Sequence, residues 1–86
     1  METKIRYTPG FVKHFCKVPV NIQKIVIKKE IIFKKNCFLP ELKTHKLSGK
    51  LSDFYSFSVN YSYRIIFCIE TDCIVFIDIG THSIYK

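Results

Sequence analysis

A chain of 86 residues is long enough for one domain, so we expect residues 1–86 to share a single hydrophobic core. Eight residues are Phe, and there are only three Gly and three Pro, which excludes a disordered or low-complexity chain. No apolar run approaches the roughly 18 residues of a transmembrane helix, and no charged segment followed by an apolar one begins the chain. We therefore expect a soluble, cytoplasmic protein.

The positive charge is concentrated in one part of the chain. Residues 1–50 contain twelve Lys or Arg and three acidic residues, for a net charge of +9, whereas residues 51–86 carry a net charge of −2. This asymmetry predicts a cationic face contributed by the first part, for which a polyanion is the natural partner. The alternative is that these lysines only solvate helix surfaces.

The first elements expected are a short strand and a helix. Lys4–Tyr7 can form the strand, and Thr8 followed by Pro9 is typical of an N-cap with proline at the first helical position. Apolar residues at spacings of three and four predict a helix that continues to about Lys17, and Pro19 ends it.

A second helix is predicted from Asn21, as N-cap, to about Lys35. Its apolar stripe consists of Ile22, Ile25, Val26, Ile32 and Phe33. Ile27 and Ile31 fall on the opposite side of this helix. They either pack against the first helix or form an exposed strip for a partner.

The second part of the chain is predicted as a loop and three strands. From Cys37 to Asp53 the periodicity disappears, and loops longer than about 12 residues in compact domains are usually functional. Strands with alternating polarity follow at 54–59, 63–70 and 73–79. The order β-α-α-β-β-β predicts an α+β fold in which two N-terminal helices cover one face of an antiparallel sheet and leave the other face free.

Polar side chains in and after these strands are candidates for a functional site. Arg64 lies in an otherwise apolar strand, so it should either pair with an acid such as Asp78 or contact an anion on the open face. Ser56 and Ser58 share one side of the preceding strand and are predicted to line that face. His82 follows the last strand, where a histidine suits proton transfer, a phosphate contact or a structural role.

The cysteines favour reduced thiols, because their positions show no CxxC spacing. A zinc site built from His14 and Cys16 with Cys68 and Cys73 is conceivable, but these intervals fit no common ligand pattern. We therefore expect no bound metal.

The C-terminal half combines several motifs. His45 begins an H-x-L-x-G loop, Arg64 lies in a Y-R-I-hydrophobic strand, and His82 ends a G-T-H motif followed by the aromatic Tyr85. In this order and spacing the motifs resemble the RelE/ParE superfamily, the toxins of type II toxin-antitoxin systems, and the preceding helices extend the resemblance over nearly the whole chain. The resemblance is strongest to the RelE and YafQ branches. It implies a RelE-like fold and cleavage of mRNA on the ribosome, with neutralisation by a small antitoxin.

The resemblance also implies catalytic roles for four residues. His82 corresponds to a catalytic residue of both branches, and Arg64 corresponds to the arginine at the scissile phosphate. His45 matches a loop histidine of the YafQ branch, and Tyr85 falls near the C-terminal tyrosine of the RelE branch.

The chain departs from both branches at three serines. Ser56 and Ser58 stand where RelE-like proteins carry catalytic lysines. Ser58 and Ser62 replace a His and an Asp of YafQ-like proteins. Neither site is complete in this sequence, so the identity of the general base is left open.

Metal-free RNA cleavage needs a base for the attacking 2′-hydroxyl, an acid for the leaving 5′-oxygen and cations for the developing charge. We assign Arg64 to the phosphate, His82 to proton transfer, and His45 to proton transfer or RNA positioning. Tyr85 is assigned to base stacking or substrate orientation. The RNA-binding residues expected around them are Lys43, Lys46, Lys50, Ser56 and Ser58.

Two alternative functions remain. A ParE-like gyrase poison binds a protein target and needs no acid-base site, and the terminal histidine argues against it. A degenerate module would bind RNA or an antitoxin without cleavage, which the missing lysines allow. The expected partners are ribosome-bound mRNA and a small acidic antitoxin whose amphipathic helix docks on Ile27 and Ile31, with no membrane and no small-molecule cofactor.

Overall fold

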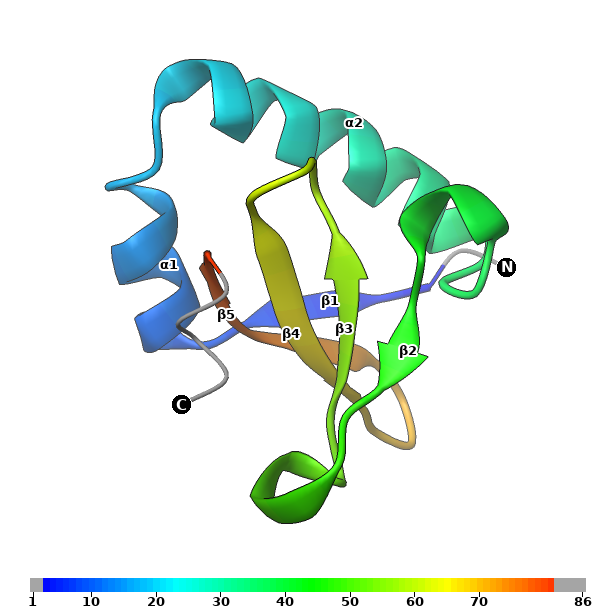
Figure 1. Cartoon of the computed structure of the whole chain (residues 1–86). Helices are drawn as coiled ribbons and strands as arrows, with labels where there is room; N and C mark the ends of the chain where they lie inside the picture. The colour runs from blue at the N-terminus through cyan, green and yellow to red at the C-terminus, as the bar shows by residue number, and fades with distance from the viewer. Residues whose placement is uncertain (1–2, 82–86) are drawn as a thin grey trace.

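The computed structural model describes residues 3–81 and shows two helices packed against a five-stranded sheet (Figure 1). The predicted α+β class is confirmed. The strands are β1 (Ile5–Tyr7), β2 (His45–Lys46), β3 (Tyr55–Ser58), β4 (Arg64–Ile69) and β5 (Ile74–Gly80); the helices are α1 (Pro9–Phe15) and α2 (Val20–Lys35); and two 3-10 turns are η1 (Pro40–Leu42) and η2 (Gly49–Leu51).

The sheet is mixed rather than wholly antiparallel, which corrects the prediction. Its strand order is β1-β5-β4-β3-β2, and β3, β4 and β5 form the predicted antiparallel meander. β1 lies parallel to β5, with Ile5 opposite Ile74. β2 lies inside the segment that was predicted as a loop and pairs with β3. Periodicity carries no information on which distant strand β1 joins.

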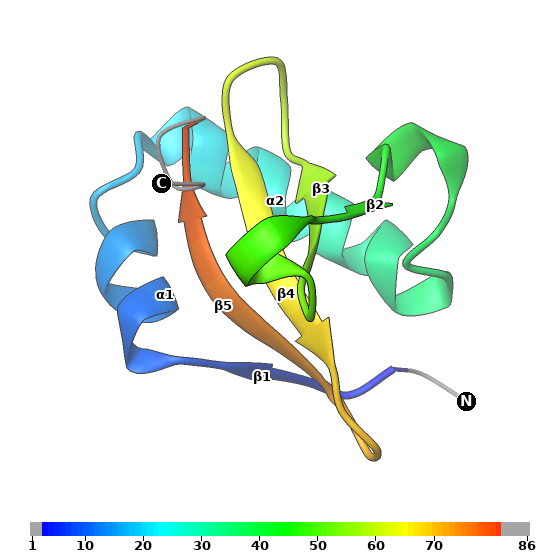
Figure 2. The same cartoon turned by 60° about the horizontal axis from the view of Figure 1, so that its bottom comes forward.

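The hydrophobic core lies between α2 and the sheet, and α2 runs across the back of the sheet in Figure 2. The predicted apolar stripe faces this core: Ile22, Val26 and Phe33 are buried, and Ile25 and Ile32 pack at its edges. The ring of Phe33 contacts the rings of Phe57, Phe67 and Phe76 at centroid distances of 4.9, 4.9 and 5.2 Å. Phe33 therefore joins α2 to β3, β4 and β5 at one point.

The helix ends differ slightly from the predicted ones. α1 ends at Phe15 rather than about Lys17, and α2 begins directly after Pro19, not after Asn21. The Nε2 of Gln23 in α2 donates a hydrogen bond to the Phe15 carbonyl at 2.9 Å. A side chain of the next helix thus satisfies a carbonyl at the end of α1, a tertiary contact that periodicity does not show.

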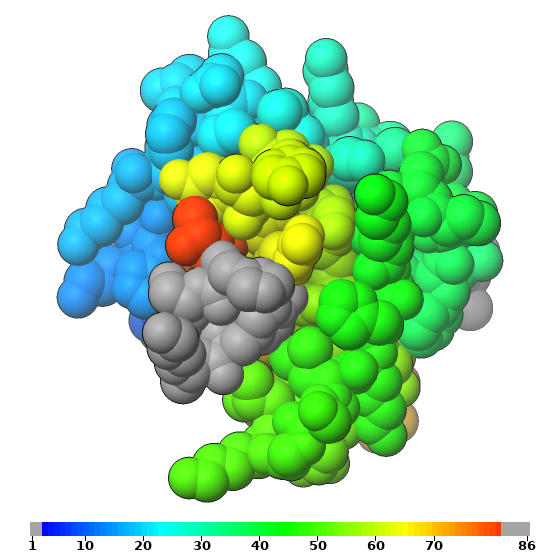
Figure 3. Space-filling view, in the orientation of Figure 1, coloured from blue at the N-terminus to red at the C-terminus, as the bar shows by residue number. Residues whose placement is uncertain are grey.

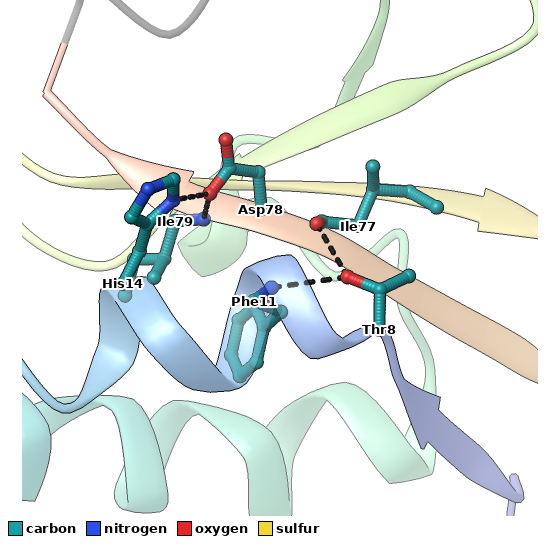
Figure 4. A network of polar contacts seen from close by, with 6 residues as sticks. All are labelled: Thr8, Phe11, His14, Ile77, Asp78 and Ile79. Atoms are coloured by element: carbon teal, nitrogen blue, oxygen red, sulfur yellow. Dashed lines mark hydrogen bonds and ion pairs between the residues drawn. The ribbon is translucent and has the colours of Figure 1, made fainter.

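Two polar contacts fasten α1 to β5 (Figure 4). Thr8 Oγ1 accepts a hydrogen bond from the Phe11 amide at 3.0 Å, as the predicted N-cap, and donates one to the Ile77 carbonyl at 2.8 Å. At the other end of the helix, His14 Nδ1 lies 2.6 Å from Asp78 Oδ1. These contacts fix α1 on the strand that leads into the C-terminal motif.

Thr8→Ala is expected to lower the free energy of unfolding by about 1–2 kcal/mol, because it removes both the helix cap and the bond to β5. Thr8→Ser keeps the hydroxyl and should recover most of that loss. Urea unfolding followed by circular dichroism measures both variants. Equal stability of Thr8→Ala and the parent would show that the two hydrogen bonds contribute nothing net.

Within residues 3–81, no helix is long and apolar enough to cross a membrane. In the same part of the chain, no three His, Cys, Asp or Glu side chains gather as a metal ion would require. The four cysteines are free thiols, and burial raises the pKa of Cys37 and of Cys68 above the ordinary value. These two thiols therefore stay protonated at neutral pH and are poor nucleophiles.

Candidate functional site

A cavity of about 780 Å³ lies beside the turn between β3 and β4. Its wall combines α2, η1 and the residue after it, the β3–β4 hairpin, and the residue that follows β5. The lining residues are Lys29, Glu41, Lys43, Ser58, Val59, Asn60, Tyr61, Ser62, Arg64 and Thr81. In Figure 3 the hairpin, in yellow, lies between α2, in cyan, and the green segment that contains η1.

Arg64 is half-buried at the start of β4, directly opposite Ser58 of β3. Its Nη1 donates a hydrogen bond to Ser58 Oγ at 2.9 Å. Asp78, the acid considered as its partner, contacts His14 instead, and within residues 3–81 no carboxylate forms a salt bridge with Arg64. A neutral hydroxyl thus orients the guanidinium and leaves its charge to act on an anion, which favours the second of the two sequence-based alternatives.

The segment around η1 brings further charges to the cavity. Lys29 Nζ of α2 lies 3.5 Å from the carbonyl oxygen of Glu41, which ties the two elements together. Lys43 follows η1 in the left-handed conformation, with φ 52° and ψ 42°. This conformation costs a non-glycine residue roughly 1–2 kcal/mol. With Arg64, three cationic side chains and one carboxylate line the cavity, so its net charge is positive and suits an anionic ligand.

His45 lies on β2, the edge strand beside β3, which carries Ser58. His45 in β2 is opposite Ser56, and its Nε2 lies 3.4 Å from Ser56 Oγ. Because side chains alternate along a strand, Ser56 and Ser58 face the same side of β3, about 7 Å apart. Three neighbouring strands therefore place His45, Ser58 and Arg64 on one face; the sequence predicted this for Ser58 and Arg64, but it placed His45 in a loop.

The prediction that Ser56 lines an open face is wrong. The Ser56 side chain is fully buried, and Ile66, opposite it on β4, is only 4% exposed. The middle of this face is therefore covered, and Ser56 has no exposed atom for RNA. It contacts the His45 ring from the protein interior.

The remaining predicted residues lie elsewhere. Lys46 follows His45 and is opposite Tyr55, so alternation directs it to the other side of β2. Lys50 lies in η2, at the opposite end of β3 from the hairpin (Figure 1). Both lysines are exposed, but neither lines the cavity. His82 and Tyr85 lie outside the described residues.

A second, apolar recess of about 280 Å³ lies between α1, α2 and the sheet. Its wall is formed by Tyr7, Phe11, Val12, Phe15, Val26, Ile27, Glu30 and Phe76. Ile27 is 55% exposed at its rim, and Ile31, one turn further along α2, is 58% exposed. The two isoleucines thus form the exposed strip rather than a packed contact with α1. The Tyr7 hydroxyl donates to the Glu30 carboxylate beside the recess; burial, together with this carboxylate, raises the pKa of Tyr7.

Sequence reasoning missed several of the cavity residues. Glu41 is the one acidic residue within the basic segment 37–52, and this isolation was a usable signal. Lys29 is one of several lysines on α2, and nothing in the sequence distinguishes it from the others. Asn60 and Tyr61 lie between the predicted strands 54–59 and 63–70, and local sequence does not show what a turn faces.

No family model matches the sequence, and no curated protein matches it. Solved structures match it over nearly its whole length. The YoeB/ParE toxin from Agrobacterium tumefaciens has a TM-score of 0.79 at 13% identity, covering 93% of this chain and 99% of that chain. The archaeal RelE–RelB complex from Pyrococcus horikoshii has a TM-score of 0.77 at 17% identity, covering 96% of this chain and 98% of that chain. The E. coli DinJ–YafQ toxin-antitoxin complex has a TM-score of 0.67 at 18% identity, covering 98% of this chain and 97% of that chain.

Two helices on a five-stranded mixed sheet form an architecture that this chain shares with the YoeB/ParE toxin and the archaeal RelE. The chain has the RelE/ParE toxin fold, as its C-terminal motifs predicted.

Proposed function

We propose that residues 1–86 form the toxin of a type II toxin-antitoxin system, a metal-independent endoribonuclease that cleaves ribosome-bound mRNA in the cytoplasm. The observation that carries the proposal is Arg64, held by Ser58 in a positively charged cavity of a RelE/ParE fold. A charged guanidinium with free donors is suited to a phosphate, because it can form two parallel hydrogen bonds with the phosphate oxygens.

In the proposed reaction the 2′-oxygen of one nucleotide attacks the adjacent phosphorus. The bond from phosphorus to the 2′-oxygen forms, and the bond to the leaving 5′-oxygen breaks. A base takes the proton of the 2′-hydroxyl, and an acid gives a proton to the 5′-oxygen. Arg64 stabilises the charge that develops on the phosphate, and Lys43 and Lys29 add positive potential to the same cavity.

The protons require titratable groups, and the cavity supplies one carboxylate, that of Glu41. We assign Glu41 as the candidate general base, since a carboxylate can accept a proton and this one lines the same cavity as Arg64. His82 remains the proposed acid, on the strength of the motif resemblance. His45 positions the RNA from the adjacent strand, and Tyr85 is proposed to orient the substrate.

Glu41→Gln is expected to slow RNA cleavage by about 100-fold while leaving the fold intact, because the amide has nearly the same size but cannot accept the proton. The measurement is the cleavage rate of an mRNA on purified ribosomes. Glu70→Gln, which removes the same charge from the turn between β4 and β5, is the matched control and should cleave like the parent. A parental rate in Glu41→Gln would assign the base to another residue.

The partner we propose is a small acidic antitoxin whose amphipathic helix covers the apolar recess and the Ile27–Ile31 strip. The solved structures of this fold include a RelE–RelB complex and the DinJ–YafQ toxin-antitoxin complex, which supports a protein partner for this chain. Two exposed isoleucines beside a recess lined by aromatic rings offer apolar area, and the lysines of α2 offer opposite charge to an acidic chain.

Ile27→Asp is expected to weaken antitoxin binding at least about tenfold, because a carboxylate would be buried in an apolar contact. Val20→Asp, at the exposed start of the same helix, is the control and should bind like the parent. Calorimetric titration with the antitoxin measures both. Parental affinity in a folded Ile27→Asp would remove this strip from the interface.

Primer extension on cellular mRNA after induction tests the function as a whole. Cuts at fixed positions within codons are expected for a ribosome-dependent nuclease. DNA damage without mRNA cuts would indicate a gyrase poison. RNA binding with neither effect would indicate a module that binds without cleaving.

A further inference from the structure

Among residues 3–81, Tyr61 is by far the most exposed large hydrophobic side chain. It is 97% exposed, whereas the next most exposed, Val20, is at 64%. A soluble domain gains nothing from an aromatic ring held wholly in water, because the hydrophobic effect favours its burial. Such a ring in the wall of a cavity indicates a surface that a ligand covers.

The main chain that carries Tyr61 is held in one conformation by its neighbours. Asn60 Oδ1 accepts hydrogen bonds from the amides of Ser62 and Tyr63 at 2.9 and 2.7 Å. The Val59 amide donates to the Tyr63 carbonyl at 2.9 Å and closes the hairpin. The ring is therefore attached to a fixed turn, only three residues before Arg64, and both residues line the same cavity.

We propose that Tyr61 is a base-stacking residue: the nucleobase next to the phosphate on Arg64 lies against the Tyr61 ring. This inference rests on the proposed function and adds the recognition of an unpaired base to it. A nucleotide offers a flat aromatic face and an anion, and this wall offers an exposed aromatic ring and a guanidinium. Only an unpaired base presents its face, so the site should prefer single-stranded RNA to a duplex.

The surroundings of Tyr61 favour a nucleic acid over a protein partner. The other residues of the wall carry hydroxyls, an amide, three cations and the carboxylate of Glu41, and its one aliphatic member, Val59, is 2% exposed. Aromatic anchors of protein interfaces lie at the centre of well-packed contacts that exclude water. A lone ring among polar and cationic groups is instead the pattern of single-strand binding sites.

The first test uses the absence of tryptophan from the chain. Tyr61→Trp places a single fluorophore at the tip of the hairpin, and stacking of a base on it should quench its emission in a saturable way. The probe is a short oligoribonucleotide with 2′-O-methyl groups, which cannot be cleaved. Inorganic tripolyphosphate, which has no base, should leave the emission unchanged. Ile69→Trp is the matched control, because Ile69 lies at the opposite end of β4 and is 47% exposed. The emission of this variant should not change when the oligonucleotide is added.

The second test compares affinities for the same oligonucleotide. Tyr61→Ala is expected to bind about tenfold more weakly, since stacking on one aromatic side chain contributes that much per base. Tyr61→Phe keeps the ring and should recover most of this loss. The same strand annealed to its complement should bind the parent more weakly than the single strand does.

The outcomes separate the inference from the proposed function. If Arg64→Ala loses affinity while Tyr61→Ala binds like the parent, the RNA site stands and stacking on Tyr61 is overturned. Stacking is also overturned if tripolyphosphate quenches Tyr61→Trp as the oligonucleotide does, or if Tyr61→Ala weakens only antitoxin binding. If Arg64→Ala and Tyr61→Ala both bind RNA like the parent, the cavity is not an RNA site and both proposals fail.

Discussion

Replacing Arg64 with alanine is expected to lower RNA cleavage by about 100- to 1000-fold and to abolish growth arrest on induction. The guanidinium lies in a cavity lined by two further cations and is oriented by Ser58 at 2.9 Å, so it can meet the phosphate without first rearranging. Donors fixed in advance stabilise developing charge better than mobile ones, because no reorganisation is needed during the reaction. Cleavage of mRNA on purified ribosomes gives the rate, and induced cultures give the growth phenotype.

Two variants make this result specific. Arg6→Ala removes an exposed arginine from β1 at the far edge of the sheet and should cleave like the parent, which excludes an effect of net charge. Arg64→Lys keeps the charge but not the planar fork, so its rate should lie between those of the parent and of Arg64→Ala. A folded Arg64→Ala that remains as active and toxic as the parent would rule out this site.

Replacing Phe33 with alanine is expected to lower the free energy of unfolding by about 3–5 kcal/mol. The side chain is 0% exposed and contacts three aromatic rings from three strands, so the cavity left behind cannot close without moving all of them. A domain of this size has a total stability of about 4–13 kcal/mol, which makes this loss a large part of the whole. Urea unfolding monitored by circular dichroism gives the difference.

Phe38→Ala is the matched control for this measurement. Phe38 is 54% exposed and contacts the ring of Tyr55 at its edge, so its removal should cost below about 1 kcal/mol. Equal losses for Phe33→Ala and Phe38→Ala would show that the three-ring contact is not the centre of the core.

The amphipathic pattern of α2 was sufficient to predict its buried face, because helical periodicity places Ile22, Val26 and Phe33 on one side whatever they pack against. The N-cap at Thr8 was predictable for a similar reason, since the cap bonds its own helix. β2 was missed because it has two residues, too few to show alternation. Its existence depends on the pairing of His45 with Ser56.

The candidate site was predictable in part. Arg64, Ser58 and Lys43 were named from the sequence and do line one cavity, because strand alternation and the hairpin between β3 and β4 fix the relation of Ser58 to Arg64. Glu41 and Lys29 were not named. Each reaches the cavity through a contact between η1 and α2, elements whose packing no local pattern encodes.

For Arg64, the sequence by itself determined that a charged side chain in an apolar strand needs an anion, and it left two anions open. Only the tertiary structure shows that Asp78 is not the partner of Arg64. α1 packs on β5 so that His14 reaches Asp78, and the β3–β4 register places Ser58 beside the guanidinium. Local sequence shows that a charged side chain in an apolar strand needs a polar or charged partner, because the cost of removing a charge from water depends on the chemistry of that side chain. Which group becomes the partner depends on elements that folding brings together from distant parts of the chain.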